Sequence, residues 1–244
     1  MRWGNDLLDL AERFREADRI DAAWDVLKLG IGNYGATNAG YAFLWRREGG
    51  YEETLLHLDY PEAYVSDFDR YGHVNHDWSI SYCVGEPEKV AFGTDERIIS
   101  RLNPEQLEAE RLGWDHDIRH FVVIPLRAAE PGAGGMSVCF RGSTRKEFKR
   151  AASVHVEDIR RTAQLFHCAI RRQPGLGGLV ELSPRECEIL TWVSAGRSSK
   201  VIAHRLNLST RTVEHHIASA QKRLGAHNRT HAVAKALVLN LIQP

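Results

Sequence analysis

Residues 182–242, LSPRECEILTWVSAGRSSKVIAHRLNLSTRTVEHHIASAQKRLGAHNRTHAVAKALVLNLI, decide the fold of the C-terminal part of the chain. They contain four segments whose apolar residues recur at helical spacing. Gly196 and Gly225 stand where the first and third segments would end, because glycine readily adopts the left-handed conformation of a helix C-cap. Serine favours helix N-termini, and the serines predicted to begin the first three helices are Ser183, Ser198 or Ser199, and Ser209. The stretch predicts an all-α domain of four helices, the last over about residues 229–241.

The second and third helices are joined by the tight turn Asn207-Leu208, as in a helix-turn-helix. The second helix of such a pair enters the major groove of DNA. Hydroxyls and helix N-terminal amides suit phosphate oxygens, and outward side chains of the first turns suit base edges. The residues predicted to contact DNA are Ser198, Ser199, Lys200, Ser209, Thr210, Arg211, Thr212, Glu214, His215, Ala218, Lys222 and Arg223.

Charge is distributed unevenly along the chain. Residues 182–244 hold nine Lys and Arg against three Asp and Glu, a net charge of +6. Residues 1–181 hold 23 Lys and Arg against 29 Asp and Glu, a net charge of −6. The chain as a whole has a formal net charge of zero, but its C-terminal part is basic and the rest is acidic. A local positive field attracts phosphates, and double-stranded DNA is the expected partner.

The same segment resembles the LuxR/NarL-type helix-turn-helix family. Glu186, Leu190 and Gly196 fall on characteristic positions of that family. Four further stretches match it in order and spacing, at 200–203, 209–213, 222–225 and 229–230. The resemblance implies that Glu214, His215 and Ala218 face base edges, where Glu can accept from cytosine and His can pair with several edges.

The chain is long enough for two domains. Residues 173–178, QPGLGG, cluster Pro and Gly after a long helical pattern, which ends the helix and gives a flexible joint. We therefore expect a sensing domain at 1–172, a linker at 173–181 and the DNA-binding domain at 182–244.

Composition points to an ordinary soluble protein of the cytoplasm. The chain is 43% hydrophobic and 26% charged, and no segment approaches the length of a membrane span. Its N-terminus has no apolar run suited to secretion, and its four cysteines lack paired spacing, as expected in a reducing compartment. Phosphate-binding-loop and nucleophile motifs are missing from the sequence, so we expect neither an enzyme nor a cofactor.

The first domain is predicted to be α+β, an antiparallel sheet between two helical layers that encloses a pocket. The predicted helices lie at 5–33 (two helices), from Pro61 to about 71, near Asp77, at 94–113 and at 143–172. The predicted strands are a hairpin at 40–48 and 51–58, then 120–127 and 136–141, with a loop at 130–135. The apolar residues of the last helix, which include Phe148, Val154, Val156, Ile159, Ala163, Phe166 and Ile170, suit either the core or a dimer interface.

This domain resembles the acyl-homoserine-lactone-binding domain of LuxR-type quorum-sensing regulators. The resemblance rests on Leu58 to Asp77, the strand from Phe121 to Pro125 and the Gly-rich loop before Ser137. In that family an Asp accepts the ligand amide N–H, and an aromatic side chain donates to the lactone carbonyl. The residues that the resemblance places at the ligand are Tyr60, Tyr64, Phe68, Asp77, Trp78, Phe121 and Ser137.

Several of these positions depart from the family pattern. Tyr64 replaces a Trp, Phe68 a Tyr, Trp78 a Pro, and Phe121 a residue that is usually Gly. A later pocket Trp of the family has no counterpart between Trp78 and Trp114. The added bulk predicts a reshaped or smaller pocket. Two mechanisms remain: a lactone or related signal completes the core, or side chains fill the pocket and the regulator acts without ligand.

A metal-responsive regulator is a third reading of the sequence. The residues that could ligate zinc or iron are His73, His76, Asp77, His116, Asp117 and His120. They lie in two separate segments, and twelve histidines in the chain make chance proximity common. The preferred hypothesis has no metal. It is a cytoplasmic homodimer that reads two half-sites of a two-fold operator, with RNA polymerase as a candidate partner and no membrane contact.

Overall fold

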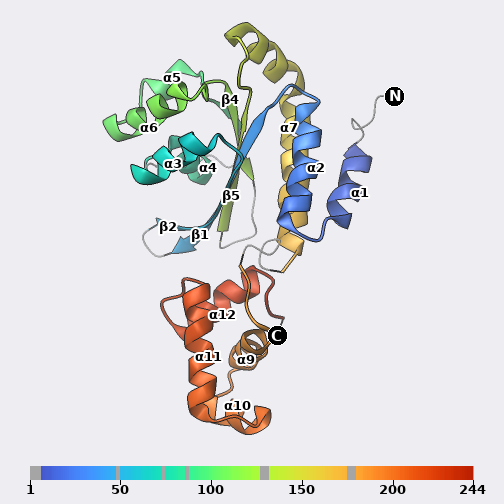
Figure 1. The fold of residues 1–244 in the computed structure, drawn as a ribbon, viewed down its shortest axis with the longest axis vertical. Helices are drawn as coiled ribbons and strands as arrows, with labels where there is room; N and C mark the ends of the chain where they lie inside the picture. The colour runs from blue at the N-terminus through green and yellow to red at the C-terminus, as the bar shows by residue number, and fades with distance from the viewer. Residues whose placement is uncertain are drawn as a thin grey trace. The chain divides into compact units, whose positions relative to one another are not determined.

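The computed structural model describes residues 7–47, 50–72, 75–85, 88–126, 132–174 and 180–243 (Figure 1). The chain separates into two compact units. The first contains the residues up to 16 together with 24–167, and the second contains 17–23 together with the residues from 168 onward. The predicted division at 173–181 stays a prediction, since this split falls earlier and residues 175–179 lie outside the described part.

The first unit is built on an antiparallel sheet. Among the described residues the sheet has five strands in the order β2-β1-β5-β4-β3. In its centre Met136 lies opposite Tyr41 on one side and Ile124 on the other. The strands are β1 (Asn38–Arg47), β2 (Gly50–Leu58), β3 (Ala91–Phe92), β4 (Phe121–Leu126) and β5 (Gly132–Cys139). The predicted hairpin and antiparallel arrangement are confirmed.

Helices cover both faces of this sheet, which makes the predicted α-β-α sandwich (Figure 1). On one face, Phe166 forms edge contacts with the rings of Phe14, Trp24 and Tyr41, at centroid distances of 6.2, 5.3 and 5.4 Å. The helices of that face are α1 (Leu7–Glu16), α2 (Ile20–Gly32) and α7 (Arg145–Arg172). The helices of the other face are α3 (Glu62–Arg70), α4 (Trp78–Gly85), α5 (Glu96–Ile99) and α6 (Pro104–Asp115).

The structure corrects three predicted elements. The single helix expected at 94–113 is two helices, because Asn103 caps α6 with a capping box and Pro104 follows it at the first turn. The short strand β3 was not predicted, since two residues are too few to show a period. The loop expected at 130–135 is mostly strand, because β5 begins at Gly132.

Two glycines of β5 allow helices to approach the sheet closely from both faces. A Cβ at Gly134 would lie 2.9 Å from Cε1 of His167 on α7. A Cβ at Gly135 would lie 2.4 Å from Sγ of Cys83 on α4. Consecutive residues of a strand face opposite sides of the sheet. Because these two glycines have no side chains, a helix packs closer to the sheet on each face at this point.

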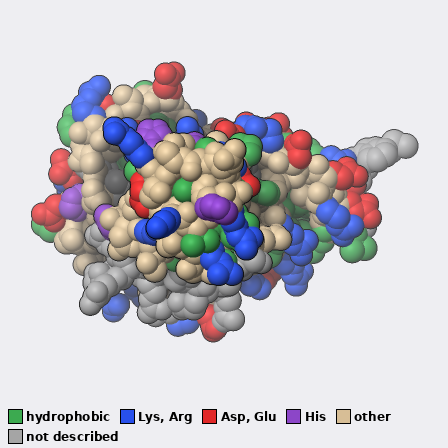
Figure 2. Space-filling view, turned by 90° about the horizontal axis from the view of Figure 1, so that it is seen from below, with side chains coloured by type: hydrophobic (Ala, Val, Ile, Leu, Met, Phe, Trp, Pro, Cys, Tyr) green, Lys and Arg blue, Asp and Glu red, His purple; other side chains and the backbone are tan. Residues whose placement is uncertain are grey.

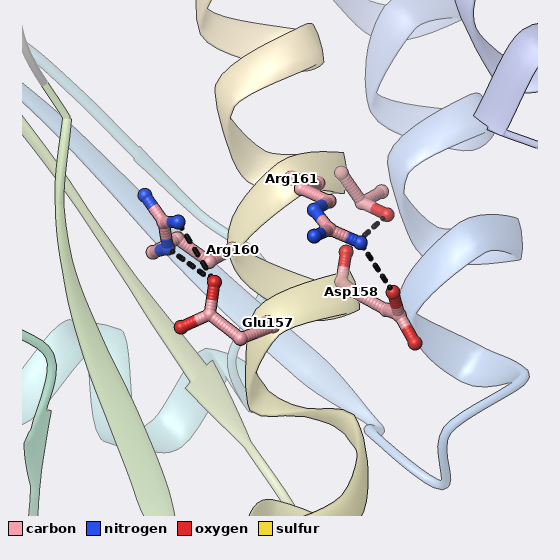
Figure 3. Close-up of polar contacts among 5 residues, drawn as sticks. Glu157, Asp158, Arg160 and Arg161 are labelled. Carbon is pink, nitrogen blue, oxygen red and sulfur yellow. Dashed lines mark hydrogen bonds and ion pairs between the residues drawn. The ribbon is translucent and has the colours of Figure 1, made fainter.

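Helix α7 contributes mainly to the core. Five of its seven predicted apolar residues are buried, namely Phe148, Ile159, Ala163, Phe166 and Ile170. Val154 is 64% exposed, and Val156 is partly buried. Two ion pairs, Glu157–Arg160 at 2.7 Å and Asp158–Arg161 at 3.3 Å, lie on opposite sides of the helix in Figure 3. The role of α7 in a dimer stays a prediction.

The second unit carries the predicted helix-turn-helix. Its helices in the described C-terminal residues are α9 (Pro184–Ser194), α10 (Ser199–Leu206), α11 (Thr210–Arg223) and α12 (Arg229–Val238). Side chains of Ser183, Ser198 and Ser209 cap the first three, as predicted. Asn207, at φ 54°, takes the left-handed conformation that ends α10 and turns the chain toward α11. The core between these helices includes the buried Ile189, Ile202, Val213 and Ile217.

No helix in the described ranges is long and apolar enough to cross a membrane.

The packing at β5 makes a prediction about Gly135. Gly135→Ala should destabilise the first unit by about 1–3 kcal/mol, because the new methyl overlaps Sγ of Cys83, which packs against the sheet at this point. Calorimetric unfolding of the full chain should show the loss as a lower Tm. Gly32→Ala is the matched control, since a Cβ there meets nothing within 4 Å. An equal Tm loss in both variants would contradict this account of the packing.

Candidate functional site

A cavity of about 80 Å³ lies in the first unit between the sheet and helices α3, α4 and α6. Its walls are partly apolar, with Leu44, Leu56 and Ile80 among the lining residues. Every residue that the sequence placed at a ligand lines this one cavity: Tyr60, Tyr64, Phe68, Asp77, Trp78, Phe121 and Ser137. The sequence therefore predicted the position of the cavity, while the ligand contacts themselves stay a prediction.

Asp77 precedes α4 and lines the cavity. Its Oδ1 accepts a hydrogen bond from the backbone N–H of Ser79 at 2.7 Å, so the carboxylate also caps the helix. Burial raises the pKa of Asp77, and the hydrogen bonds from Ser79 and Ile80 oppose that rise. The carboxylate thus combines the helix-capping role with a position from which it can accept from a ligand.

Glu110 of α6 is a second carboxylate in the cavity wall, and the sequence reading missed it. Only 7% of the residue is exposed. Its Oε2 accepts from Nε1 of Trp78 at 2.8 Å, and its Oε1 accepts from Nε1 of Trp114 at 3.1 Å. Burial raises its pKa to about 7, the two indole donors lower it, and the charge of Asp77 raises it further. The i, i+4 spacing of Glu110 and Trp114 was the one sequence signal for this pair.

Hydroxyl groups complete the polar part of the cavity. The Tyr60 hydroxyl and Oγ of Ser137 are 2.8 Å apart, a hydrogen bond between β5 and the start of α3. Tyr64 is 8% exposed, and its hydroxyl has no hydrogen-bond partner among the described residues. Burial, with the charges of Asp77 and Glu110, raises the pKa of Tyr64. Its neutral hydroxyl is therefore free to donate to a ligand carbonyl.

Large aromatic side chains reduce the cavity. The rings of Trp78 and Phe121 lie 5.9 Å apart, centroid to centroid. Phe121 packs over Gly93, where a Cβ would lie 2.3 Å from the ring. Phe68 stacks beside Tyr64 at 5.5 Å. Pockets for drug-sized ligands usually measure about 300–1,000 Å³, so the cavity is small, as the bulk of Trp78 and Phe121 predicts.

The candidate metal ligands are dispersed. His116 lies 3.9 Å from Asp67, the backbone N–H of Gly142 donates to Asp117, and His120 lies 3.3 Å from the Ser143 hydroxyl. In the described ranges no three His, Cys, Asp or Glu side chains come together as a metal site. His73 lies outside the described residues.

The helix-turn-helix presents α11 with an exposed polar face. Arg211, His215, Ala218 and Lys222 are exposed, and so are Thr210 and Lys200 nearby. Figure 2 shows Lys, Arg and His side chains at several places on the face nearest the viewer, among wider tan areas. The exposed Lys200, Arg211 and Lys222 supply the positive charge that attracts DNA phosphates, and the outward side chains of α11 can contact base edges.

Besides the helix caps Ser198 and Ser209, further predicted DNA-contacting residues also bind within the unit. Ser199 is buried and donates a short hydrogen bond to Oε1 of Glu214. Arg229 at the start of α12 donates to Oγ of Ser199 at 3.1 Å and to the carbonyl of Arg197 at 3.0 Å. Nε of Arg223 lies 3.5 Å from the buried carboxylate of Glu186. Base contact by Glu214 and phosphate contact by Arg223 stay predictions, and both side chains also fix α11.

The far end of α11 is held by a buried lysine. Lys235 of α12 is 2% exposed, and its Nζ donates to the carbonyls of Leu224 and Gly225 at 3.0 and 3.3 Å. A cation at a helix C-terminus satisfies the last carbonyls and the helix dipole. The sequence reading took 229–241 as a plain amphipathic helix and did not find this contact.

Comparison with known families agrees with both units. Residues 19–170 match the family model of the autoinducer binding domain, and residues 180–236 match that of the bacterial regulatory proteins of the luxR family. A cavity with a few buried polar groups in an α-β-α unit, followed by a helix-turn-helix, is the architecture of a transcriptional regulator with a small-molecule-binding domain. The chain belongs to the family of LuxR-type quorum-sensing transcriptional regulators.

Individual relatives span the chain or its C-terminal part. The transcriptional activator protein BjaR1 of Bradyrhizobium diazoefficiens is 23% identical over 99% of this chain and 98% of its own length. The quorum-sensing regulator RpaR of Rhodopseudomonas palustris is 50% identical over 25% of this chain and 26% of its own. The crystal structure of Escherichia coli SdiA shares the fold, with a TM-score of 0.58 and 21% identity over 98% of both chains.

The buried Glu110 makes a prediction about pH. Its pKa is higher in the folded chain than the ordinary 4.5, so the folded state keeps a proton that the unfolded state has lost. The contribution of Glu110 to stability should therefore fall as pH rises from 4.5 to 7, by on the order of 3 kcal/mol, and be constant outside that window. Glu110→Gln should remove this part of the pH dependence, whatever it does to stability at one pH. Urea unfolding at several pH values measures the difference between the two proteins.

The control for that experiment is Glu108→Gln on the same helix. Glu108 is exposed, so the substitution changes charge without changing a buried carboxylate. Its stability should follow the wild-type pH slope. A Glu110→Gln protein with an unaltered slope would mean that this carboxylate titrates normally.

Proposed function

We propose that the chain regulates transcription as a homodimer on a two-fold operator, under control of a small molecule bound in the Asp77 cavity. The observation that carries this proposal is the convergence of Asp77, Tyr60, Tyr64 and Ser137 on one buried cavity in a chain that also presents an exposed recognition helix. The predicted working site is the cytoplasm, and RNA polymerase is the proposed partner at a promoter. Catalysis has no part in this proposal.

An acyl-homoserine lactone or a related signal fits the polar groups of the cavity. Its amide N–H would donate to Asp77, and its carbonyl would accept from the free hydroxyl of Tyr64. Asp77 already accepts hydrogen bonds from Ser79 and Ile80, and a ligand amide N–H would add a further donor to this buried carboxylate. SdiA, whose fold this chain shares, has been solved in complex with octanoyl-rac-glycerol. That complex supports a preference for a polar head with an acyl chain.

A ligand-independent regulator is the second candidate function. The observation that favours it is the small cavity, about 80 Å³, reduced by Trp78 and Phe121. In that case aromatic side chains take the place of the ligand, and the free protein is folded and binds DNA.

The two candidates are separated by ligand-dependent stability. Lactones with acyl chains of four to twelve carbons are added to the purified full chain, and Tm is measured with and without each one. A ligand at a hundred times its Kd should stabilise the protein by about 2.7 kcal/mol. Asp77→Asn should lose most of that shift, whereas Asp69→Asn, at an exposed position of α3, should keep it. If no lactone shifts Tm and the free protein binds DNA, lactone control is refuted and the ligand-independent function is favoured.

DNA recognition makes a separate prediction about α11. Arg211 is exposed, and Arg211→Ala should weaken binding to all sequences and reduce the slope of log affinity against log salt by about 0.9 per copy. His215→Ala should instead relax preference at one base pair of each half-site, by about 1–3 kcal/mol. Affinities for an operator and its single-base variants, measured at several salt concentrations, test both. Identical sequence profiles for the two variants would refute the division of roles.

A further inference from the structure

The donors and acceptors in the cavity wall are out of balance. Asp77 and Glu110 are the carboxylates that line it, and among its described lining residues there is no Lys, Arg or His. A carboxylate has about four acceptor positions. Glu110 uses one position on each oxygen for the indoles of Trp78 and Trp114, which leaves further positions open. The cavity therefore has a surplus of negatively charged acceptors.

The donors available to a neutral ligand are correspondingly few. Nε1 of Trp78 and of Trp114 are both taken by Glu110. The hydroxyls of Tyr60 and Ser137 share one hydrogen bond, which uses one of their two O–H groups and leaves the other available. Tyr64 is 8% exposed, and its hydroxyl has no hydrogen-bond partner among the described residues. A ligand with many carbonyl oxygens would find two hydroxyl donors, whereas a ligand with several N–H groups would find two carboxylates.

The two carboxylates come from different helices and act on the same space. Asp77 stands directly before α4, and Glu110 lies in α6. The negative charge of Asp77 raises the pKa of Glu110. Bringing two negative groups into one buried cavity is unfavourable unless a positive charge joins them or one stays protonated. Hydrogen bonds between ionised partners are also about twice as strong as those between neutral groups.

We propose that the cavity selects a small amphiphile whose polar head carries a protonated amine in addition to an amide. The amide N–H binds Asp77, the amide carbonyl accepts from Tyr64, and the ammonium group binds Glu110. The apolar tail packs against Leu44, Leu56 and Ile80. This inference rests on the proposed function, since it names the chemical class of the signal, and it makes Glu110 a specificity-determining residue.

The test compares two probes that differ in one group. N-(2-aminoethyl)hexanamide has an amide and an ammonium group, and N-(2-hydroxyethyl)hexanamide has a hydroxyl in place of the amine. Binding of each to the purified full chain is measured by titration calorimetry at pH 7.5, with N-hexanoyl-homoserine lactone as the third ligand. The ammonium probe should bind at least tenfold more tightly than the hydroxyl probe. In Glu110→Gln the two affinities should come within about twofold of each other, and in Glu108→Gln the tenfold ratio should remain.

Each result decides between defined alternatives. Equal affinity of the wild-type protein for the two probes, or tighter binding of the hydroxyl probe, overturns the inference, and this comparison holds even if Glu110→Gln fails to fold. Binding of the lactone alone overturns the inference but leaves the proposed ligand control standing. Binding of none of the three, together with the absence of a Tm shift across the lactone series, removes the proposed ligand control as well. A tenfold ratio that survives Glu110→Gln shows that Glu110 is not the selecting group.

Discussion

The close approach of two helices to one point of β5 is the constraint on which the first unit depends. Gly134 and Gly135 are consecutive, so their missing side chains lie on opposite faces of the sheet, against His167 and Cys83 respectively. The hydrophobic layer behind the sheet and the cavity in front of it share this thin centre. A side chain at either glycine would push one layer outward, and the position of α4 sets where Asp77 and Trp78 stand.

The hydrogen bonds among the buried polar groups determine which ligand groups the cavity can bind. Trp78 and Phe121 reduce the volume that a relative with smaller residues there would have. Trp78 also carries an indole N–H, and Glu110 supplies its acceptor. The side chain that narrows the cavity is thus hydrogen-bonded to a carboxylate in the wall, so the shape of the cavity and its charge are coupled at this position. A change in shape alone would select smaller ligands, whereas a change in charge selects a different chemistry.

A structural feature of this protein can be predicted from the sequence where the residues that determine it are close together in the chain. Caps at Ser183, Ser198 and Ser209 were predictable, because side-chain capping needs only neighbouring residues. Asp77 and Tyr64 could be assigned to one cavity through their positions in a family pattern. Glu110 could not, because its partner Trp78 is 32 residues away and only the packing of α4 on α6 joins them. The strand beginning at Gly132 was missed for the same reason, since its glycines matter only when Cys83 and His167 lie beside them.

The contacts around α11 have a consequence for control. Glu214, Ser199 and Arg229 tie one end of the recognition helix to its neighbours, and Lys235 holds the carbonyls at the other. A helix fixed at both ends pays little entropy to adopt its DNA-bound shape, since it already has it. The recognition helix α11 is therefore rigid. Under the proposed function, a signal would therefore act by changing how many paired copies exist, or how far apart their recognition helices stand.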